Sequence, residues 1–443
     1  MKSAKGKSRR EDPLRVHITT LGCSKNTYDS EILAGQLQYS GALLVEQPQE
    51  ADAIIINTCG FITPAKQESI DAILEAEQLK QRAQNKKVIV CGCLAQRYKE
   101  ALETEIPGVD ATFGTEAFED VLHFLGLGQG YNPEFLYQHR TLSTPSHYAY
   151  LKISEGCNHT CAFCAIPIIR GRHRSRPLSR LVDEARRLAD QGVRELILIA
   201  QDTTFYGVDL YGSQKLVELL QQLESIAGLR WIRLHYLYPT TVEDRLIYYI
   251  AESEKVVPYL DMPVQHASDR MLQIMKRGGS AKRLRQILEL ARKVIPDVAL
   301  RTSVIVGHPG EREEDFQLLV QFVKEMAFDR LGVFIYSHEE GTAAYQLQDL
   351  PQELKQERFQ QIMALQQKIS LHKNEEKIGR SLEVLIDEVD AENALAVGRT
   401  ASDSPEIDNE VIIHLAGHTT IPGQFCKVNI FDASEYELYG KLI

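Results

Sequence analysis

Apolar and amphipathic stretches alternate along residues 14–115. Three short apolar runs predict buried strands: "LRVHITTLGC", "ADAIIINTCG" and "KKVIVCGC". Between them, apolar residues recur every three or four positions, which predicts helices in "DSEILAGQLQYSG" and "PAKQESIDAILEAEQLKQRAQ". Strands that alternate with helices through short turns are typical of a parallel sheet covered by helices. This part of the chain is therefore predicted to be an α/β domain.

The alternation continues from residue 148 to about 337 with six strand-like runs: "YAYLKI", "ELILIA", "WIRLHY", "PYLDMP", "VALRTSVIV" and "LGVFIY". Amphipathic stretches such as "RLVDEARRLADQG" separate them. Repeated strand–helix units favour a wound or barrel-like α/β domain, and six units make a partial barrel that is open along one side. The long helical pattern at 351–378 is predicted to be a connector.

After about residue 380 the pattern becomes short, alternating and β-rich, as in "SLEVLIDEV" and "EVIIHL". Such a pattern predicts a small antiparallel β-barrel. The predicted fold class is thus α/β with three domains. Their bounds, with a basic disordered arm and a linker, are 1–13 (arm), 14–125 (N-terminal sheet domain), 126–147 (linker), 148–375 (partial barrel) and 376–443 (small barrel).

Composition limits where this 443-residue chain works. It has no apolar run of about eighteen residues, so no membrane span is expected. Its basic first residues lack the apolar stretch of a secretory signal, and its eight cysteines therefore indicate a reducing compartment. The net charge of −11 argues against broad nucleic-acid binding, although a local basic patch is compatible with it. We expect a cytoplasmic monomer.

Three cysteines follow the first strand of the central domain: Cys157, Cys161 and Cys164 in "EGCNHTCAFC". Thiolates are soft ligands that suit zinc or an iron–sulfur cluster. A cubane cluster held by three cysteines keeps one iron open for a substrate or cofactor. The alternative is a three-cysteine zinc site completed by His159 or by a distant histidine. Loops at the carboxyl ends of barrel strands are where this architecture keeps its chemistry.

A second set of cysteines stands at the strand ends of the N-terminal domain: Cys23, Cys59 and Cys93. The carboxyl ends of parallel strands share one sheet edge, so these residues can meet in space. The alternative is that each is a small buried hydrophobic residue. Cys91 lies two positions before Cys93, and strand alternation does not separate the two. Cys426 is predicted to be structural.

The spacing of Cys157, Cys161 and Cys164, with Phe163 before the last of them, resembles the signature of the radical S-adenosylmethionine superfamily. That resemblance implies that the three cysteines hold a 4Fe–4S cluster whose open iron binds S-adenosylmethionine. One-electron cleavage of this cofactor then yields methionine and a 5′-deoxyadenosyl radical. The resemblance also implies that Phe163 lies near the adenine.

Two further segments are expected to contact the cofactor. "SVIVGHPGE" (303–311), which contains Gly307, resembles the glycine-containing strand that packs against S-adenosylmethionine in this superfamily. His308 departs from the pattern, because related enzymes usually carry Phe there, so a core or surface histidine is its alternative. Gln201 and Asp202 in "QDTT" follow the second barrel strand and face the same edge.

Three N-terminal segments resemble the methylthiotransferase family: "LGCSKNTYDSE", "INTCGFITPAKQESI" and "CGCLAQR". The resemblance implies that Cys23, Cys59 and Cys93, rather than Cys91, hold a second 4Fe–4S cluster. This cluster carries or supplies sulfur, while the other activates a C–H bond. A carbon without an acidic proton makes hydrogen-atom abstraction a sensible route. One S-adenosylmethionine would give the methyl group and another the radical, and external electron and sulfur donors are expected.

The family has one branch that modifies adenosine in transfer RNA and another that modifies an aspartate β-carbon on the twelfth protein of the small ribosomal subunit. Residues 371–443 hold six Lys and Arg against fourteen Asp and Glu, a net charge of −8. An RNA-binding module should be basic, whereas an acidic one suits a basic ribosomal protein. An acidic surface that serves solubility is the alternative. "GRTASDSPEID", "YLDMPVQHASDRML" and "LGVFIYSHEEGTAA" resemble the ribosomal-protein branch.

The predicted substrate contacts come from two segments, the basic "IIRGRHRSRPLSR" and the acidic "GRTASDSPEID": Arg170, Arg172, Arg174, Asp403, Glu406 and Asp408. Arginine pairs in bidentate fashion with carboxylate or phosphate, so the basic segment would meet the substrate or ribosomal RNA. A solvated loop is its alternative. The expected function is methylthiolation of the ribosomal protein, free or within the ribosome. The rivals are transfer-RNA methylthiolation and a non-catalytic, zinc-stapled ribosome-binding protein.

Overall fold

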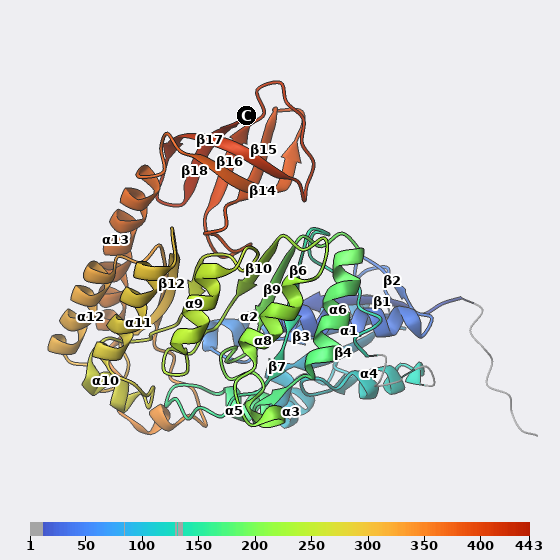
Figure 1. Ribbon diagram of the computed structural model, residues 1–443. Coiled ribbons are helices and arrows are strands. Elements are labelled where there is room, and N and C mark those ends of the chain that lie inside the picture. Colours follow the sequence, from blue (N-terminus) through green and yellow to red (C-terminus); the bar gives the residue numbers. More distant parts are fainter. Residues whose placement is uncertain (1–11, 84, 129–130, 132–135) are drawn as a thin grey trace, which may run out of the picture. The chain divides into compact units, whose positions relative to one another are not determined.

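The computed structural model describes residues 12–83, 85–128, 131 and 136–443. The chain divides into two compact units, Met1–Ser143 and Thr144–Ile443 (Figure 1). The second unit holds both the predicted partial barrel and the predicted small barrel. Within the described residues, no helix has the length and apolar character that a membrane crossing requires.

The first unit is built on a five-stranded sheet in the order β2-β1-β3-β4-β5, with every neighbouring pair parallel. The three predicted strands are β1 (Arg15–Thr20), β3 (Ala53–Thr58) and β4 (Lys87–Gly92). Two edge strands were not predicted, β2 (Leu43–Leu44) and β5 (Ala111–Thr112). Each is only two residues long, too short to produce an apolar period.

In the described part of this unit, four helices accompany the sheet: α1 (Ser24–Tyr39), α2 (Thr63–Arg82), α3 (Cys93–Glu105) and α4 (Phe118–Phe124). Ile54, Ile56, Val88 and Val90 of the central strands pack with α2 and α3 in one buried cluster. Intervening strand residues such as Ile55 are equally buried on the opposite face. A sheet covered on both faces explains why its strands are continuous apolar runs rather than alternating ones.

The second half of the predicted linker is not free. In its described part, the backbone N–H of Thr141 donates to the carbonyl of Glu31, and the N–H of Ser143 donates to the Glu31 carboxylate at 2.8 Å. Arg140 forms a buried ion pair with the same carboxylate. This segment therefore packs on α1 and belongs to the first unit.

The second unit contains all six predicted parallel strands, in two sheets of three: β6 (Tyr148–Lys152), β9 (Glu195–Ile199), β10 (Trp231–Leu234), β11 (Tyr259–Asp261), β12 (Ala299–Val306) and β13 (Arg330–Ile335). A parallel bridge between Ile232 and Val256 connects the two sheets. The strand order is thus β6-β9-β10-β11-β12-β13, which follows the order of the six strands along the chain. In the described residues β6 and β13 do not pair with each other, so the barrel is open as predicted.

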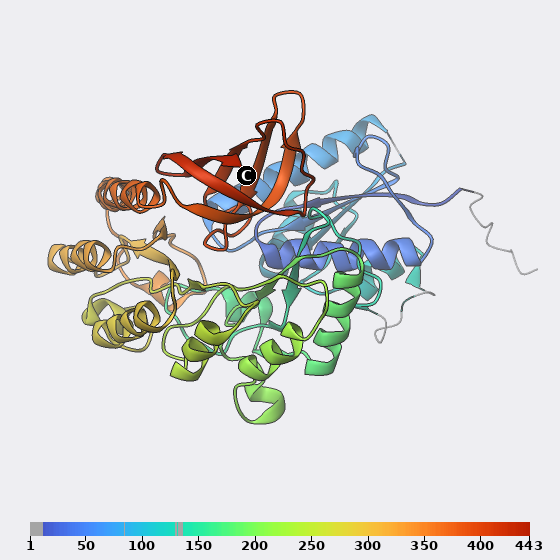
Figure 2. The ribbon, with the colours of Figure 1, turned by 45° about the horizontal axis from the view of Figure 1, so that its top comes forward.

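Helices flank these strands in a curved row, which Figure 2 shows from green to orange. The long ones are α6 (Leu178–Asp190), α8 (Leu216–Glu224), α9 (Asp244–Glu252), α11 (Ala281–Val294), α12 (Glu313–Met326) and α13 (Gln352–Glu375). Short elements complete the loops: α5 (Ile166–Arg170), α7 (Val208–Tyr211), α10 (Asp269–Ile274), the 3-10 turn Ala343–Gln346 and the pair β7 (Ser154–Glu155) and β8 (Arg174–Ser175). α6 shows the rule, because Leu181, Ala185 and Leu188 recur at helical spacing and are buried.

The small C-terminal barrel is closed, with the strand order β14-β15-β16-β18-β17. Its strands are β14 (Ser381–Asp390), β15 (Leu395–Arg399), β16 (Glu410–His414), β17 (Phe425–Ala433) and β18 (Glu437–Leu442). One detail of the prediction is wrong, since β16 and β18 are parallel while the other neighbours are antiparallel. A closed ring with an odd number of strands cannot alternate direction throughout, so one parallel pair is unavoidable.

The end of β15 and the segment that follows it join this barrel to the six-stranded part. Arg399 pairs with Glu195 at 2.7 Å, and Asp403 pairs with Arg330. Glu195 and Arg330 are the first residues of β9 and β13, so the small barrel docks at the amino-terminal ends of the parallel strands (Figure 1). Removing one partner of a buried ion pair costs about 3–5 kcal/mol, so these pairs fix the docking firmly.

Candidate functional site

The loop that carries Cys157, Cys161 and Cys164 leaves the carboxyl end of β6 by way of β7. The backbone N–H of Cys157 donates to the carbonyl of Gly171 at 3.1 Å. Between the other two cysteines, the N–H of Ala162 donates to the carbonyl of Met275 at 2.8 Å, and the carbonyl of Ala162 accepts from Ala344 at 2.7 Å. The loop is therefore hydrogen-bonded to the end of α10 and to the segment after β13. It lies at the carboxyl ends of the strands, where the sequence predicted the chemistry.

All three thiols are half-buried and free. Burial raises the pKa of Cys157 to about 11 and that of Cys164 to about 12, and the neighbouring thiols add to the rise. The positive charge of Arg277 acts on both in the opposite direction. Thiols of this kind stay protonated at neutral pH until a metal replaces the proton. Three desolvated thiols on one loop, beside a cation, fit the donor set of an iron–sulfur cluster.

His159, the local histidine of the zinc alternative, makes two contacts within the protein. Its Nε2 lies 2.7 Å from Oδ2 of Asp202, and its ring stacks on Tyr238 at a centroid distance of 3.6 Å. Among the described residues, no group of three or more His, Cys, Asp and Glu side chains is placed to hold one metal ion. A cubane cluster makes a different demand, because each cysteine binds a different iron and the thiols need not converge on one point.

Glu155, two residues before the first of these cysteines, is the centre of a buried network. Its Oε2 accepts from Lys152 at 2.6 Å and from Arg170 at 3.1 Å, and its Oε1 accepts from Gln201 at 2.7 Å. Burial opposes ionisation, but the charges of Lys152 and Arg170 lower the pKa of Glu155 to about 2. The Arg170 side chain is only 2% exposed, so its prediction as a substrate contact is wrong.

Gln201 and Asp202 follow β9 and reach the cysteine loop, but both side chains already have protein partners. Gln201 donates to Glu155 through Nε2. Asp202 accepts from the backbone N–H of Thr204 at 3.0 Å through Oδ1 and faces His159 through Oδ2. Asp202 also lines a cavity of about 230 Å³ with Cys157, Asn158, His159, His173 and Phe205. A direct contact of Gln201 or Asp202 with S-adenosylmethionine remains a prediction.

The structure brings Phe163 together with the glycine-containing strand, although about 145 residues separate them in the sequence. The Phe163 ring meets the His308 ring edge-on at 6.3 Å, and Phe163 packs on an apolar cluster that includes Ala162 and Tyr336. Gly307 has a φ of +73°, and a Cβ there would lie 2.4 Å from the side chain of Lys355. Only glycine fits this close approach without strain.

Two of the predicted arginines are exposed and one acidic candidate stays on the surface. Arg172 and Arg174 point outward, while His173 and Ser175 between and after them are buried. Glu406 is exposed and accepts a hydrogen bond from the hydroxyl of Tyr148 at 3.0 Å. These three residues remain candidates for contact with a partner.

Asp403 and Asp408 are not substrate contacts, and this part of the prediction is wrong. The Asp403 side chain is 1% exposed and bonds to Arg330. The Asp408 side chain is also 1% exposed and bonds to Arg301 at 3.2 Å. Both carboxylates form ion pairs where the small barrel contacts the six-stranded part. This contact lies at the amino-terminal strand ends, opposite the ends that carry Cys157. The acidic balance of the small barrel is therefore partly an internal charge balance.

In the first unit, the three cysteines end or follow neighbouring parallel elements. Cys23 precedes the first residue of α1, Cys59 follows β3, and Cys93 is the first residue of α3. Gly22 has a φ of +96°, and a Cβ there would lie 3.0 Å from the Cys59 sulfur. The carboxyl edge of the sheet thus gathers residues that lie far apart in the sequence, as predicted for a parallel sheet.

Sequence reasoning missed Asn26, which links these three cysteines. Its backbone N–H donates to the carbonyl of Cys23 at 2.8 Å, and its Nδ2 donates to the carbonyl of Thr58, beside Cys59, at 3.0 Å. Its Oδ1 lies 3.6 Å from the sulfur of Cys93 and accepts from it. A fully buried asparagine in the first turn of a helix is costly unless it is hydrogen-bonded. The only signal in the sequence was a polar residue directly after "CSK".

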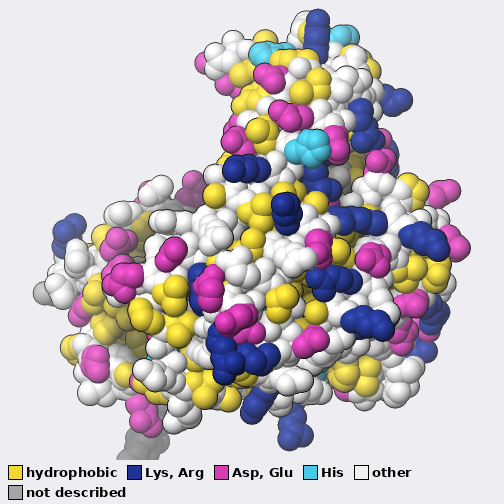
Figure 3. All heavy atoms as spheres, turned by 90° about the vertical axis from the view of Figure 1, so that its left-hand side faces the viewer, with side chains coloured by type: hydrophobic (Ala, Val, Ile, Leu, Met, Phe, Trp, Pro, Cys, Tyr) yellow, Lys and Arg dark blue, Asp and Glu magenta, His cyan; other side chains and the backbone are white. Residues whose placement is uncertain are grey.

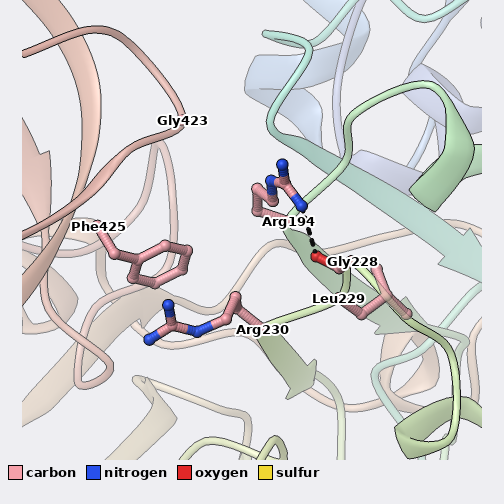
Figure 4. Close-up of a pocket in the computed structure, with 6 residues that line it drawn as sticks. All are labelled: Arg194, Gly228, Leu229, Arg230, Gly423 and Phe425. Carbon is pink, nitrogen blue, oxygen red and sulfur yellow. Dashed lines mark hydrogen bonds between the residues drawn. The ribbon is translucent and has the colours of Figure 1, made fainter.

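A larger cavity, of about 290 Å³, lies elsewhere, between the small barrel and the starts of β9 and β10 (Figure 4). Its lining residues are Arg194, Gly228, Leu229, Arg230, Gly423 and Phe425. Arg230 lies 4.4 Å from the centre of the Phe425 ring and pairs with Glu383, so it helps to hold the joint. No thiol lines this cavity, so we place the chemistry at the cysteine loops.

Surface charge does not mark a further site on the face seen in Figure 3. Lys and Arg side chains are interspersed there with Asp and Glu side chains. Mixed charges of this kind favour solubility rather than the steering of a highly charged partner.

Three family models match successive parts of the chain. They are Uncharacterized protein family UPF0004 over residues 15–114, the Radical SAM superfamily over 151–323 and the TRAM domain over 378–443. The matches follow the sheet of the first unit, the six-stranded part and the small barrel. They agree with the three-part architecture described above.

Curated relatives match over almost the whole length. "Ribosomal protein uS12 methylthiotransferase RimO" of Aquifex aeolicus is 51% identical, over 97% of this chain and 97% of its own. The protein of the same name from Flavobacterium psychrophilum is 48% identical, over 96% of this chain and 98% of its own. The Sulfurihydrogenibium protein of that name is also 48% identical, over 97% and 99%.

Solved structures are similar at the level of the fold. The radical S-adenosylmethionine methyltransferase TsrM from Kitasatospora setae superposes with a TM-score of 0.56 at 13% identity, over 86% of this chain and 79% of its own. The cobalamin-dependent radical enzyme OxsB gives a TM-score of 0.51 at 11% identity, over 81% and 56%. At such low identity the likeness supports the architecture alone.

Proposed function

The chain belongs to the RimO family of ribosomal protein uS12 methylthiotransferases, and from this premise we propose that it attaches a methylthio group to the β-carbon of an aspartate in that ribosomal protein. The observation that carries the proposal is the 51% identity to a uS12 methylthiotransferase over 97% of both chains. The enzyme is a radical S-adenosylmethionine protein that uses this cofactor and 4Fe–4S clusters.

Held by these cysteines, the clusters and S-adenosylmethionine would supply one-electron chemistry for breaking an unactivated C–H bond, together with the methyl group and a site for sulfur transfer. We assign one cluster to Cys157, Cys161 and Cys164, and the other to Cys23, Cys59 and Cys93. The support lies in two sets of thiols, each at the carboxyl edge of a parallel sheet.

In the second unit, this chain's own residues hold the loop and exclude water. The buried Glu155 network holds the start of the loop against the end of β6. Phe163, Ala162 and Tyr336 form an apolar wall. Gly307, without a side chain, lets the backbone approach this wall closely, so we assign Phe163 and Gly307 to cofactor binding.

In the first unit, Asn26 orients the thiol-bearing segments. Its backbone N–H donates to the carbonyl of Cys23, and its side-chain amide bonds to the carbonyl of Thr58, beside Cys59, and to the thiol of Cys93. Three cysteines on three different elements then present their sulfurs in a fixed relation. A site that must hold a cluster during sulfur transfer needs this kind of supporting shell.

The substrate, uS12, is met outside these sites. We assign its recognition to Arg172 and Arg174, the exposed guanidiniums of the segment after the cysteine loop, because a guanidinium pairs in bidentate fashion with a carboxylate. External electron and sulfur donors complete the reaction, and we place the enzyme in the cytoplasm as a monomer.

The decisive experiment compares a strain that lacks the gene with the same strain carrying it. Mass spectrometry of uS12 should show an unmodified aspartate in the first strain and a methylthio-aspartate in the second, with transfer-RNA nucleosides unchanged. If the nucleoside modification disappears while the uS12 mark persists, the target is transfer RNA.

Metal analysis of anaerobically prepared protein tests the chemistry separately. Two cubane clusters correspond to about eight irons per chain, with matching sulfide. Zinc without iron would point instead to a stapled, non-catalytic protein.

A further inference from the structure

Three side chains are stacked beside the cysteine loop. The ring of His159 lies on one face of Tyr238, with an angle of 7° between the ring planes. The guanidinium carbon of Arg277 lies 4.1 Å from the centre of the same Tyr238 ring. Asp202 fixes His159 at one end of this group through the 2.7 Å contact with its Nε2. The arrangement brings a cation to a cysteine-bearing loop in one orientation.

Arg277 is held from several directions. It is only 9% exposed, its Nη2 donates to the carbonyl of Pro263 at 2.5 Å, and its backbone N–H donates to the carbonyl of Leu272 at 2.9 Å. The hydroxyl of Tyr238 donates to the Arg277 carbonyl. The entropy cost of ordering this long side chain is therefore met by folding rather than by binding of a charged group.

The other terminal nitrogen, Nη1, donates to the sulfur of Cys161 at 3.6 Å. A neutral thiol is a weak acceptor, whereas a metal-bound thiolate carries negative charge and makes the bond charge-assisted. Arg277 thus brings a buried positive charge into hydrogen-bond contact with a thiol of this loop.

On the basis of the proposed function, we propose that Arg277 is a positioning residue that makes the cluster on Cys157, Cys161 and Cys164 easier to reduce. Reduction takes one electron from the external donor and breaks no bond at Arg277. It adds negative charge to the irons and their sulfurs, and an N–H···S hydrogen bond from a cation stabilises this charge. The oxidised cluster gains less from the same bond, so the difference favours reduction.

The test is a redox titration followed by electron paramagnetic resonance. The full-length chain with Cys23, Cys59 and Cys93 changed to Ala isolates the cluster of interest. In this background, R277Q should lower the equilibrium constant for reduction about tenfold, which is about 59 mV for one electron. R277K keeps the charge but loses the planar fork and the stacking, so it should shift the constant in the same direction by less.

The matched control is R283Q, which removes an exposed arginine paired with Asp244 on the outside of α11 and should leave the constant unchanged. An R277Q constant within about twofold of the parent overturns the proposal. If R277Q fails to assemble the cluster, the result rests on R277K, and an R277K constant equal to the parent's overturns it. If the parent itself binds no iron, the proposed function fails rather than this assignment.

Discussion

The two sets of cysteines reach similar ends by different means. Cys23, Cys59 and Cys93 stand at three places along one sheet edge and are linked by a single buried residue, Asn26, through its backbone N–H and its side-chain amide. Cys157, Cys161 and Cys164 come from one loop, which ionic and stacking contacts support from outside. The fold of the sheet brings the first set together, whereas the second set is already close in the sequence because one loop carries it.

This difference decides what a substitution can do. A change that disturbs the sheet of the first unit moves its three cysteines relative to one another, because each stands on a different element. A change around the second loop moves its cysteines as a group, because eight residues of chain hold them together. The second site can therefore vary in its electrostatics while its geometry persists.

Removing one cysteine from either set separates their roles. C161A and C59A should each abolish the methylthiolated product, because the reaction needs both clusters, and each should lose about half of the iron. C59A should still cleave S-adenosylmethionine reductively, whereas C161A should not. Iron analysis and chromatography of the cleavage products measure both. C426A, a free cysteine of the small barrel, is the control and should change neither.

The network under the second loop is the next point of attack. E155Q removes the charge that pairs with the buried Lys152 and Arg170, and we expect the free energy of unfolding to fall by about 3–5 kcal/mol. Urea unfolding measures this loss, and E218Q, at a half-exposed pair with Lys215, should cost less than about 1 kcal/mol. Equal losses in the two variants would show that the Glu155 network does not carry the loop.

The amide of the first site offers the corresponding test. N26A removes the partner of the Thr58 carbonyl and of the Cys93 thiol, both buried, so we expect a loss of about 1–3 kcal/mol in unfolding free energy. N26A should also lower the iron content of the first site. The double variant with C161A and N26A should therefore lose nearly all iron. Iron retained in full by N26A would mean that the sheet alone positions the three cysteines.

The sequence predicted the architecture well because it is periodic. All six strands of the partial barrel, the three main strands of the first sheet and the closed small barrel follow from apolar runs and their spacing. The shared sheet edge also followed, since parallel strands place their carboxyl ends together. The parallel pair β16 and β18 was missed because strand direction leaves no periodic signal in a five-stranded ring.

Side-chain partners could not be predicted in the same way. Asp403 and Asp408 looked like a surface for a basic protein. They form ion pairs instead with Arg330 and Arg301, which lie far away in the sequence. Arg170 looked like a substrate contact but pairs with Glu155. A charge in a sequence does not state its partner, and only the folded chain shows whether it is already neutralised.

The smallest expected effect is a loss of unfolding free energy at low pH. It should act on the helices that hold the second cysteine loop. Asp315 accepts from Ser268 at 2.6 Å and from Arg270 and the N–H of Arg312, and despite some burial these hydrogen bonds lower its pKa to about 2. Its folded pKa lies below its unfolded value of 3.8. The stability it contributes, about 2 kcal/mol, is therefore complete above pH 4 and lost as the pH falls from about 4 to about 2.

Ser268 caps α10, whose end holds the cysteine loop through Met275, so this acid loss should loosen the second loop. D315N should flatten the dependence of unfolding free energy on pH over that interval, as measured by urea titrations at several pH values. D183N, at an exposed pair with Arg186, is the matched control and should leave the slope unchanged. If unfolding free energy falls with pH equally in D315N and the parent, other carboxylates cause the acid sensitivity of this unit. The contact of Asp315 in α12 with Ser268 at α10 would then not depend on pH.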